Sequence, residues 1–122
     1  MISLIADRFD AFIAEDKEEP VVMLNLLRFK VDGGREMYQD YLAAAGPIVQ
    51  WHGGAITFAG DGLTALAAET GQTWDAVVLV RYPSRRAFAD LIADPDYAKA
   101  DALRMAALEE AVLQPVRPVQ PA

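Results

Sequence analysis

The chain has 122 residues and a formal charge of −7, a size and charge that fit one globular domain. Hydrophobic residues make up 53% and charged residues 24%, which is typical of a folded protein and not of a disordered one. With 11 basic side chains against 18 acidic ones, no basic surface for a phosphate backbone is expected, so we exclude nucleic acid as a partner. Cysteine is absent and His52 is the only histidine, so we expect no metal and no cofactor, haem included.

The N-terminal region has no basic segment before its apolar residues, and it reaches Asp7 and Arg8 too early for a signal peptide. The longest uncharged stretch, residues 41–60, contains Pro47 and four glycines, so it does not have the unbroken apolar character of a membrane-spanning helix. We therefore expect a cytoplasmic protein without a membrane partner.

Three regions follow from the pattern along the chain. Residues 1–19 are predicted to be a helical extension, because apolar residues from Ile2 to Ile13 recur at helical spacing before a charged run and Pro20. Residues 20–118 are predicted to form the main domain, and residues 119–122 a loose tail.

The main domain begins with a predicted strand and helix. Val21–Leu27 is apolar on both strand faces except at Asn25. A turn at residues 32–34 leads into an amphipathic helix that we expect to kink or break at Gly46-Pro47 and to end at Gly53-Gly54.

A hairpin is predicted next, with Ala55–Ala59 and Leu63–Ala68 as its strands and a tight turn between them at residues 60–62. Trp74–Tyr82 is the longest predicted strand, and its middle is again apolar on both faces.

Two helices and a strand complete the predicted domain. Ser84 is expected to cap the first helix, and Asp94-Pro95 to start the second, which runs to about Glu110. Ala111–Val116 is predicted to be an edge strand because it contains Pro115.

This order of elements predicts an α+β fold, a ferredoxin-like split βαβ antiparallel sheet with helices on one face and an additional N-terminal helix. Two strands are apolar on both faces, yet helices in this topology cover only one. We therefore expect the other face to be covered by a second copy of the chain in a homodimer.

Several segments resemble, in order and spacing, a family known as domain of unknown function 1330. The match extends from about Pro20 to Val116. Its segments are Val21–Lys30, Tyr38–Tyr41, Gly53-Gly54, Trp74–Val77, Arg81–Ser84, Asp94–Tyr97 and Leu103-Arg104. The resemblance implies a dimeric α+β barrel in which two ferredoxin-like sheets face each other, and it implies no particular reaction.

The ligand-binding candidates are polar or aromatic residues of the types used in the cavities of related dimeric barrels, which include cofactor-free monooxygenases and haem-degrading enzymes. Asn25 is the polar exception in its strand, either a buried amide satisfied by neighbouring backbone or a hydrogen-bonding group in the cavity. The other candidates, each of which has an alternative structural interpretation, are Tyr41, Trp74, Arg81, Tyr97 and Arg104. No residue is assigned as catalytic.

His52 is interpreted as a capping residue at the end of its helix, because a histidine cation there meets the negative end of the helix dipole. The haem-degrading relatives carry their histidine on a later helix, and residues 84–93 contain none, which speaks against haem. The acidic pairs Asp94/Asp96 and Glu109-Glu110 are interpreted as helix caps and solvated surface.

Two classes of function stay open. The first is a small enzyme, a cofactor-independent monooxygenase or an isomerase, acting on a small apolar or aromatic substrate in the cavity. The second is a ligand-binding or structural homodimer without turnover. A cavity holding Asn25 with an arginine or a tyrosine favours the enzyme, and a filled interior favours the structural dimer.

Overall fold

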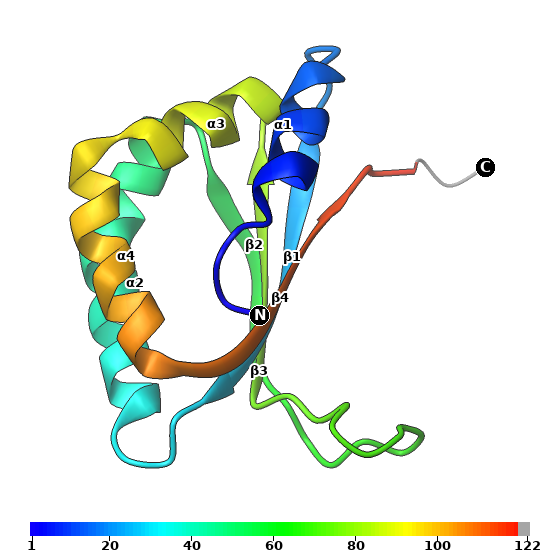
Figure 1. Ribbon diagram of the computed structural model, residues 1–122, viewed down its shortest axis with the longest axis vertical. Helices are drawn as coiled ribbons and strands as arrows, with labels where there is room; N and C mark the ends of the chain where they lie inside the picture. Colours follow the sequence, from blue (N-terminus) through cyan, green and yellow to red (C-terminus); the bar gives the residue numbers. More distant parts are fainter. Residues whose placement is uncertain (120–122) are drawn as a thin grey trace.

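The computed structural model describes residues 1–119 and has a four-stranded antiparallel sheet with helices packed on one face (Figure 1). The strand order is β2-β3-β1-β4, which confirms the predicted α+β ferredoxin-like fold. In chain order the elements are α1 (Ala6–Ala14), β1 (Val21–Phe29), α2 (Gly34–Trp51), β2 (Ala55–Asp61), β3 (Ala76–Tyr82), α3 (Arg85–Ala93), α4 (Pro95–Ala107) and β4 (Leu108–Val116).

The central strand β1 separates two sheet faces. Val21, Met23 and Leu27 are buried against the helices, whereas the alternate residues point to the side that carries no helix. We call this second side the open face. The strand register places the apolar side chains of the open face next to one another across neighbouring strands. They are Val22, Leu24, Leu26, Phe58, Val77, Leu79 and Val112. The sheet is therefore apolar on both sides, as its two central strands predict.

The helical face holds the core. Leu27, Leu91 and Leu108 are its largest completely buried side chains and come from β1, α3 and β4. The predicted caps are present, because Ser84 Oγ accepts from the amide of Ala87 and Asp94 Oδ1 accepts from the amide of Asp96. These caps fix where α3 and α4 begin.

The predicted hairpin strand Leu63–Ala68 is wrong. Those residues form part of a long exposed connection, and β2 pairs with β3 instead. The amide of Gly62 donates to the carbonyl of Asp75 at 2.8 Å, and a Cβ at Gly62 would lie 2.0 Å from the carbonyl oxygen of Trp74. Gly62 thus allows a close approach to the start of β3, and not the tight turn of a hairpin.

Two further boundaries differ from the prediction. The helix α2 runs without a break through Gly46-Pro47, since glycine before proline has no Cβ to clash with the proline ring. The helix α4 ends at Ala107, short of Glu110, because Leu108 is completely buried opposite Phe29 and begins strand β4 there. As predicted, this strand lies at the edge of the sheet.

The N-terminal extension is helical only from Ala6 onward, so the predicted helical role of Ile2 and Ile5 is wrong. We call residues 1–5 the N-terminal strap. Arg104 Nη2 donates to the carbonyl of Ile2 at 2.8 Å, and the amino group of Met1 donates to the carbonyl of Ala111 at 3.0 Å and pairs with Glu110. These contacts hold the start of the strap beside β4, from where it curves round to α1 with a bend at Ser3 (Figure 1).

The helix α1 packs on α3 through aromatic side chains. Phe9 and Phe12 meet the ring of Phe88 edge to face, and Arg85 Nη1 donates to the carbonyl of Phe12 at 3.0 Å. Of the predicted loose tail, residues 120–122 lie outside the described residues.

Candidate functional site

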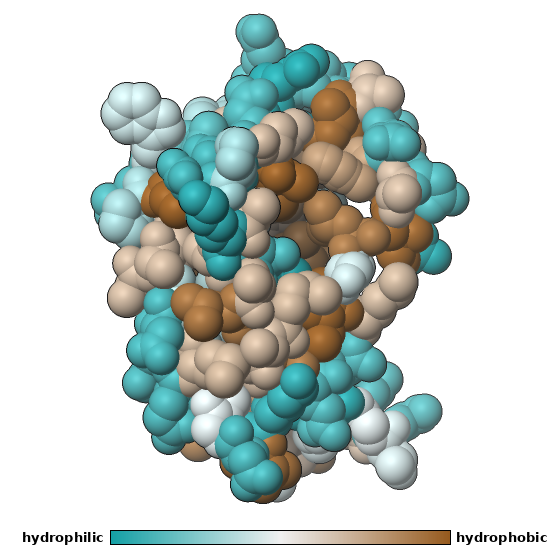
Figure 2. Space-filling model, turned by 60° about the vertical axis from the view of Figure 1, so that its left-hand side comes forward, coloured by the Kyte–Doolittle hydropathy of each residue, from teal (hydrophilic) through white to brown (hydrophobic). Residues whose placement is uncertain are grey.

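A cavity of about 530 Å³ lies between the sheet and the helices of the chain. A second space of about 420 Å³ adjoins it beside α1 and β4. We call them the inner cavity and the outer chamber. The residues that line both are Ser3, Leu4, Met23, Asn25, Phe88, Arg104 and Leu113. The strap, through Ser3 and Leu4, thus contributes to the boundary between the inner cavity and the outer chamber. The surface of the molecule is hollowed where apolar side chains gather (Figure 2).

Three tyrosines from α2 and α4 line the inner cavity. The hydroxyls of Tyr41 and Tyr97 are 2.8 Å apart, and the ring of Tyr38 lies 5.2 Å from that of Tyr41. Burial raises the pKa of Tyr38 to about 12, and it raises the pKa of Tyr41 and of Tyr97 above the ordinary value of 10.0. All three hydroxyls are therefore protonated at neutral pH and able to donate hydrogen bonds.

Arg104 is the basic group of the inner cavity. Its Nε donates to Asp101 Oδ1 at 2.8 Å while its Nη2 holds the strap through Ile2. Burial is the largest influence on the pKa of Arg104 and opposes its charge, but the hydrogen bond to Asp101 and the charge interactions with Asp101, Tyr97 and Tyr41 together outweigh burial and raise the pKa of the guanidinium. The charge of Arg104 is thus paired with the Asp101 carboxyl group within the lining.

Asn25 presents an acceptor to both spaces. Its Nδ2 donates to the carbonyls of Met23 at 3.3 Å and of Val78 at 3.2 Å. Both partners are acceptors, so the atom between them must be the amide nitrogen and not the oxygen. Within residues 1–119 no group donates to Oδ1 of Asn25, which leaves this oxygen for a ligand.

The structure brings Asn25, Tyr41, Tyr97 and Arg104 together around the inner cavity, and it places the other two candidates elsewhere. Arg81 is exposed and stands opposite Val22 on the open face. The ring of Trp74 lies 5.4 Å from the guanidinium carbon of Arg28 in a cation–π contact before β3. Trp74 and Arg81 therefore do not belong to the cavity site.

The sequence reasoning missed Tyr38, Asp101 and the strap. Tyr38 is three residues before the predicted candidate Tyr41, and Asp101 is three residues before the predicted candidate Arg104. Helical spacing alone therefore places each of them on the same helix face as that candidate. No pattern in the sequence indicated that the strap lines the cavity.

His52 is the C-cap residue of α2, at the helix end where it was predicted, and lines neither cavity. Its Nε2 lies 2.8 Å from Oδ2 of Asp94, the N-cap residue of α4. This hydrogen bond from His52 is the main cause that lowers the pKa of Asp94. The two residues join one end of α2 to the start of α4.

Among the residues that the structure describes, no three histidine, cysteine or acidic side chains converge in a way that could hold a metal ion. None of the helices in the same range combines the length and the apolar character that crossing a membrane requires.

The strand order and the helices packed on one face define a ferredoxin-like α+β protein. The chain belongs to the family described as domain of unknown function (DUF1330), whose model matches residues 27–114. This match confirms the resemblance found in the sequence. No curated protein matches the chain.

Solved structures resemble the whole chain. A protein of unknown function from Rhodopseudomonas palustris is 33% identical, covers 98% of each chain and has a TM-score of 0.90. A dimeric ferredoxin-like protein of unknown function from Jannaschia sp. CCS1 is 11% identical over 81% of this chain and 99% of its own, with a TM-score of 0.63.

A hydroxynitrile lyase from Passiflora edulis is 14% identical over 85% of this chain and 99% of its own, with a TM-score of 0.64. At this level of identity the lyase and the Jannaschia protein indicate the shared fold alone.

Proposed function

We propose that the chain forms a homodimer in which each protomer binds one small, mainly apolar molecule in its inner cavity. The observation that carries this proposal is an unfilled space of about 530 Å³ with apolar walls and a few convergent polar groups. That size and lining are typical of small-molecule sites. A purely structural dimer would have no need of such a space in the middle of its core.

The polar groups define how the molecule would be held. Tyr97 and Arg104 supply donors from α4, and Oδ1 of Asn25 supplies an acceptor from β1. The facing walls are aliphatic, with Val78, Val80, Leu42 and Ile92 among them. A hydroxyl on an apolar body can both donate to Asn25 Oδ1 and accept from the donors of α4, whereas a carbonyl can only accept from those donors.

The open face supports the homodimer. Leu24 of β1 and Leu79 of β3 are direct partners on the two central strands. Phe58 of β2 is the partner of Leu79 on the other side, and its side chain is 55% exposed. The connection after β2 extends from the sheet on the side away from α2 and α4 (Figure 1), and it exposes Leu63 and Leu66 almost completely. Apolar side chains in this arrangement fit a second sheet packed face to face.

Catalysis without a resident cofactor, as a monooxygenase or an isomerase, is a second candidate. One observation favours it: the inner cavity holds Asn25 together with Tyr97 and Arg104, the combination expected of an enzyme. Tyr41 and Arg104 favour an anion at Tyr97, although burial and Asp101 oppose it and the pKa of Tyr97 is raised. A substrate oxygen beside Tyr97 would receive the same support as it gained negative charge.

Titration with naphthalenemethanol, followed by calorimetry, tests the binding proposal. This neutral probe has an aromatic body and one hydroxyl. We expect saturable binding with one probe per protomer. Absence of saturable binding would contradict the proposal.

The position Gly46 offers a matched pair of control variants. It lines the inner cavity, and apart from its chain neighbours and the backbone of its own helix a Cβ at this position meets nothing within 4 Å. Gly46→Phe should block the cavity and abolish binding, whereas Gly46→Ala adds the same Cβ before Pro47 without the ring and should bind as the wild type does. Loss of binding in both variants would point to a backbone effect and not to occlusion.

A further inference from the structure

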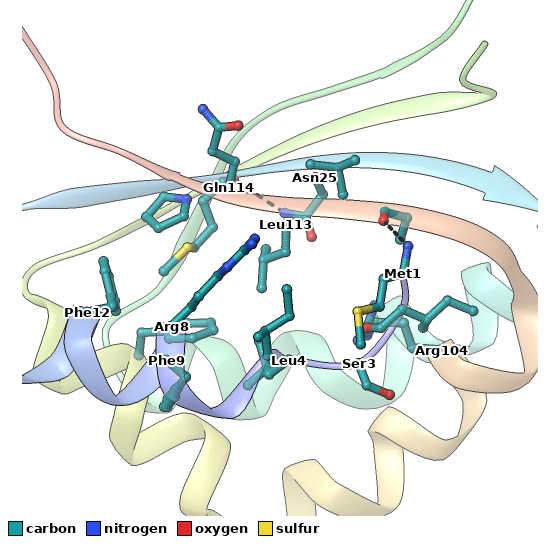
Figure 3. A pocket seen from close by; sticks show the side chains of 17 residues that line it. Met1, Ser3, Leu4, Arg8, Phe9, Phe12, Asn25, Arg104, Leu113 and Gln114 are labelled. Atoms are coloured by element: carbon teal, nitrogen blue, oxygen red, sulfur yellow. Dashed lines mark hydrogen bonds between the residues drawn. The ribbon is translucent and has the colours of Figure 1, made fainter. Parts of the chain in front are cut away.

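Arg8 brings an unpaired positive charge to the outer chamber. Its side chain extends from α1 across the chamber toward the strands (Figure 3). Within residues 1–119 no carboxylate lies within 4.0 Å of its guanidinium, and the neighbouring Asp7 accepts from the backbone amide of Arg8 instead. The residue is exposed, so its guanidinium is hydrated where it lines the chamber.

The two spaces together have a local positive balance. Their charged groups are Arg8, Asp101, Arg104 and the amino group of Met1, which pairs with Glu110. Because Asp101 and Arg104 neutralise each other, Arg8 leaves the lining with one uncompensated positive charge. This sign is opposite to the net charge of −7 of the chain, so among the charged groups of the lining Arg8 is the one that would attract an anion.

Apolar side chains surround the rest of the outer chamber. Phe9, Phe12 and Phe88 stand on the side of the helices, and Met23 and Leu113 on the side of the sheet. Leu4 of the strap projects between them (Figure 3). An aromatic or aliphatic body would be in contact with apolar atoms on both sides, and a carboxylate at one end would reach the Arg8 guanidinium.

We infer that the natural ligand is an organic acid, with an apolar body in the cavity system and a carboxylate paired with Arg8. The inference rests on the proposed binding function and adds the charge of the ligand to it. It assigns the recognition of that charge to α1, which lies outside residues 27–114 matched by the family model. Arg8 acts as a point of charge recognition, and Asn25 Oδ1 remains for a donor on the body of the ligand.

Two matched pairs of probes test the inference by calorimetry: naphthoate with naphthalenemethanol, and octanoate with octanol. In each pair the body is the same and only the charge differs. We expect each acid to bind about tenfold more tightly than its alcohol, which corresponds to one charge-assisted hydrogen bond. The advantage of the acid should decrease as salt is added.

The variant Arg8→Gln should remove the advantage of the acids and leave the affinity for the alcohols unchanged. Arg86→Gln is the matched control, because Arg86 is exposed on α3 and lines neither space. It removes the same net charge and should bind all four probes as the wild type does. A thermal melt of each variant confirms that the fold is retained.

Equal binding of acid and alcohol, or an unchanged advantage in Arg8→Gln, would overturn the inference and leave the binding proposal intact. An equal loss in Arg86→Gln would assign the effect to net charge and also overturn it. Failure of all four probes to bind would overturn the inference together with the binding proposal.

Discussion

The hydroxyls of Tyr41 and Tyr97 lie 2.8 Å apart in a buried contact that joins α2 to α4. Both rings are less than a tenth exposed, and both hydroxyls border the inner cavity. Each hydroxyl is thus a partner for the other in the empty protein and a possible partner for a ligand. The pair connects the packing of the two long helices to the chemistry of the cavity.

We predict that Tyr97→Phe lowers the free energy of unfolding by about 1–3 kcal/mol, because the buried hydroxyl of Tyr41 then lacks a partner. The double variant Tyr41→Phe/Tyr97→Phe should be more stable than the sum of the two single changes implies, since no hydroxyl is left unpaired. Urea unfolding of the four proteins measures this coupling. Additive effects would mean that the hydrogen bond makes no contribution of its own.

Arg104 is predicted to hold the strap in place. Arg104→Met removes the donors to Ile2 and Asp101 and should lower the free energy of unfolding by about 1.5–3 kcal/mol, a range typical of hydrogen bonds to charged groups. It should also speed hydrogen exchange in the N-terminal peptide that includes residues 1–5. Arg104→Lys keeps the charge but cannot make both contacts. Hydrogen exchange of residues 1–5 in this variant should therefore be faster than in the wild type and slower than in Arg104→Met.

The exchange of peptides from β1 serves as the internal control, because those amides lie in the middle of the sheet. If exchange in the strap were the same in Arg104→Met as in the wild type, the hydrogen bond to Ile2 would not be what holds the strap.

Much of the fold could be predicted because its signals are local. Val21–Leu27 is apolar on both faces, which already implied a central strand and a second packing surface. Ser84 and Asp94 precede helices with the side-chain acceptors that such ends need, and both caps are present. In contrast, Leu63–Ala68 forms no strand, although the outer edge of β2 has no neighbouring strand within residues 1–119.

The site could be predicted only in part, because it depends on contacts between distant residues. In a strand that is apolar on both faces, alternation does not tell which face is the inner one, and Arg81 falls on the open face beside buried Tyr82. The position of the strap also depends on a contact between distant residues. Ile2 and Ile5 have helical spacing, yet residues 1–5 are not helical, and Arg104, 102 residues away, holds the carbonyl of Ile2 through a hydrogen bond.

The pair His52–Asp94 predicts how stability changes in acid. Chiefly because of the hydrogen bond from His52, the pKa of Asp94 in the folded protein lies below its ordinary value of 3.8. Near that pH the unfolded chain therefore binds more protons than the folded one. The contribution of Asp94 is fully present above the ordinary pKa, and it is lost as the pH falls through the lowered, folded-state pKa.

Asp94→Asn should therefore be less stable than the wild type at neutral pH, and the difference should shrink toward acid pH. Asparagine still caps a helix, so the substitution removes the charge and keeps the cap. Thermal melts of both proteins, from neutral pH to below the ordinary Asp94 pKa of 3.8, measure this difference in stability. Asp90→Asn, at an exposed position of α3, removes an equal charge and should show no comparable trend. A gap between wild type and Asp94→Asn that stayed constant with pH would refute the linkage.

The open face predicts the oligomeric state and how to change it. Light scattering at micromolar concentration should give about twice the chain mass of 13.3 kDa. Phe58→Asp places a carboxylate on the open face of β2, where the ring is exposed in the single chain and would be buried against a second sheet. Burying an unpaired carboxylate should weaken the dimer by about a hundredfold or more.

An aspartate substituted for another exposed apolar side chain, away from the open face, provides the control. Val31 is 95% exposed in the turn between β1 and α2, and Val31→Asp should leave the dimer unchanged. Circular dichroism of Phe58→Asp should match the wild type, because the substituted side chain does not belong to the core of the single chain. A wild-type protein that scatters as a folded monomer would refute the dimer. A Phe58→Asp variant that remains as dimeric as Val31→Asp would place the interface on another surface.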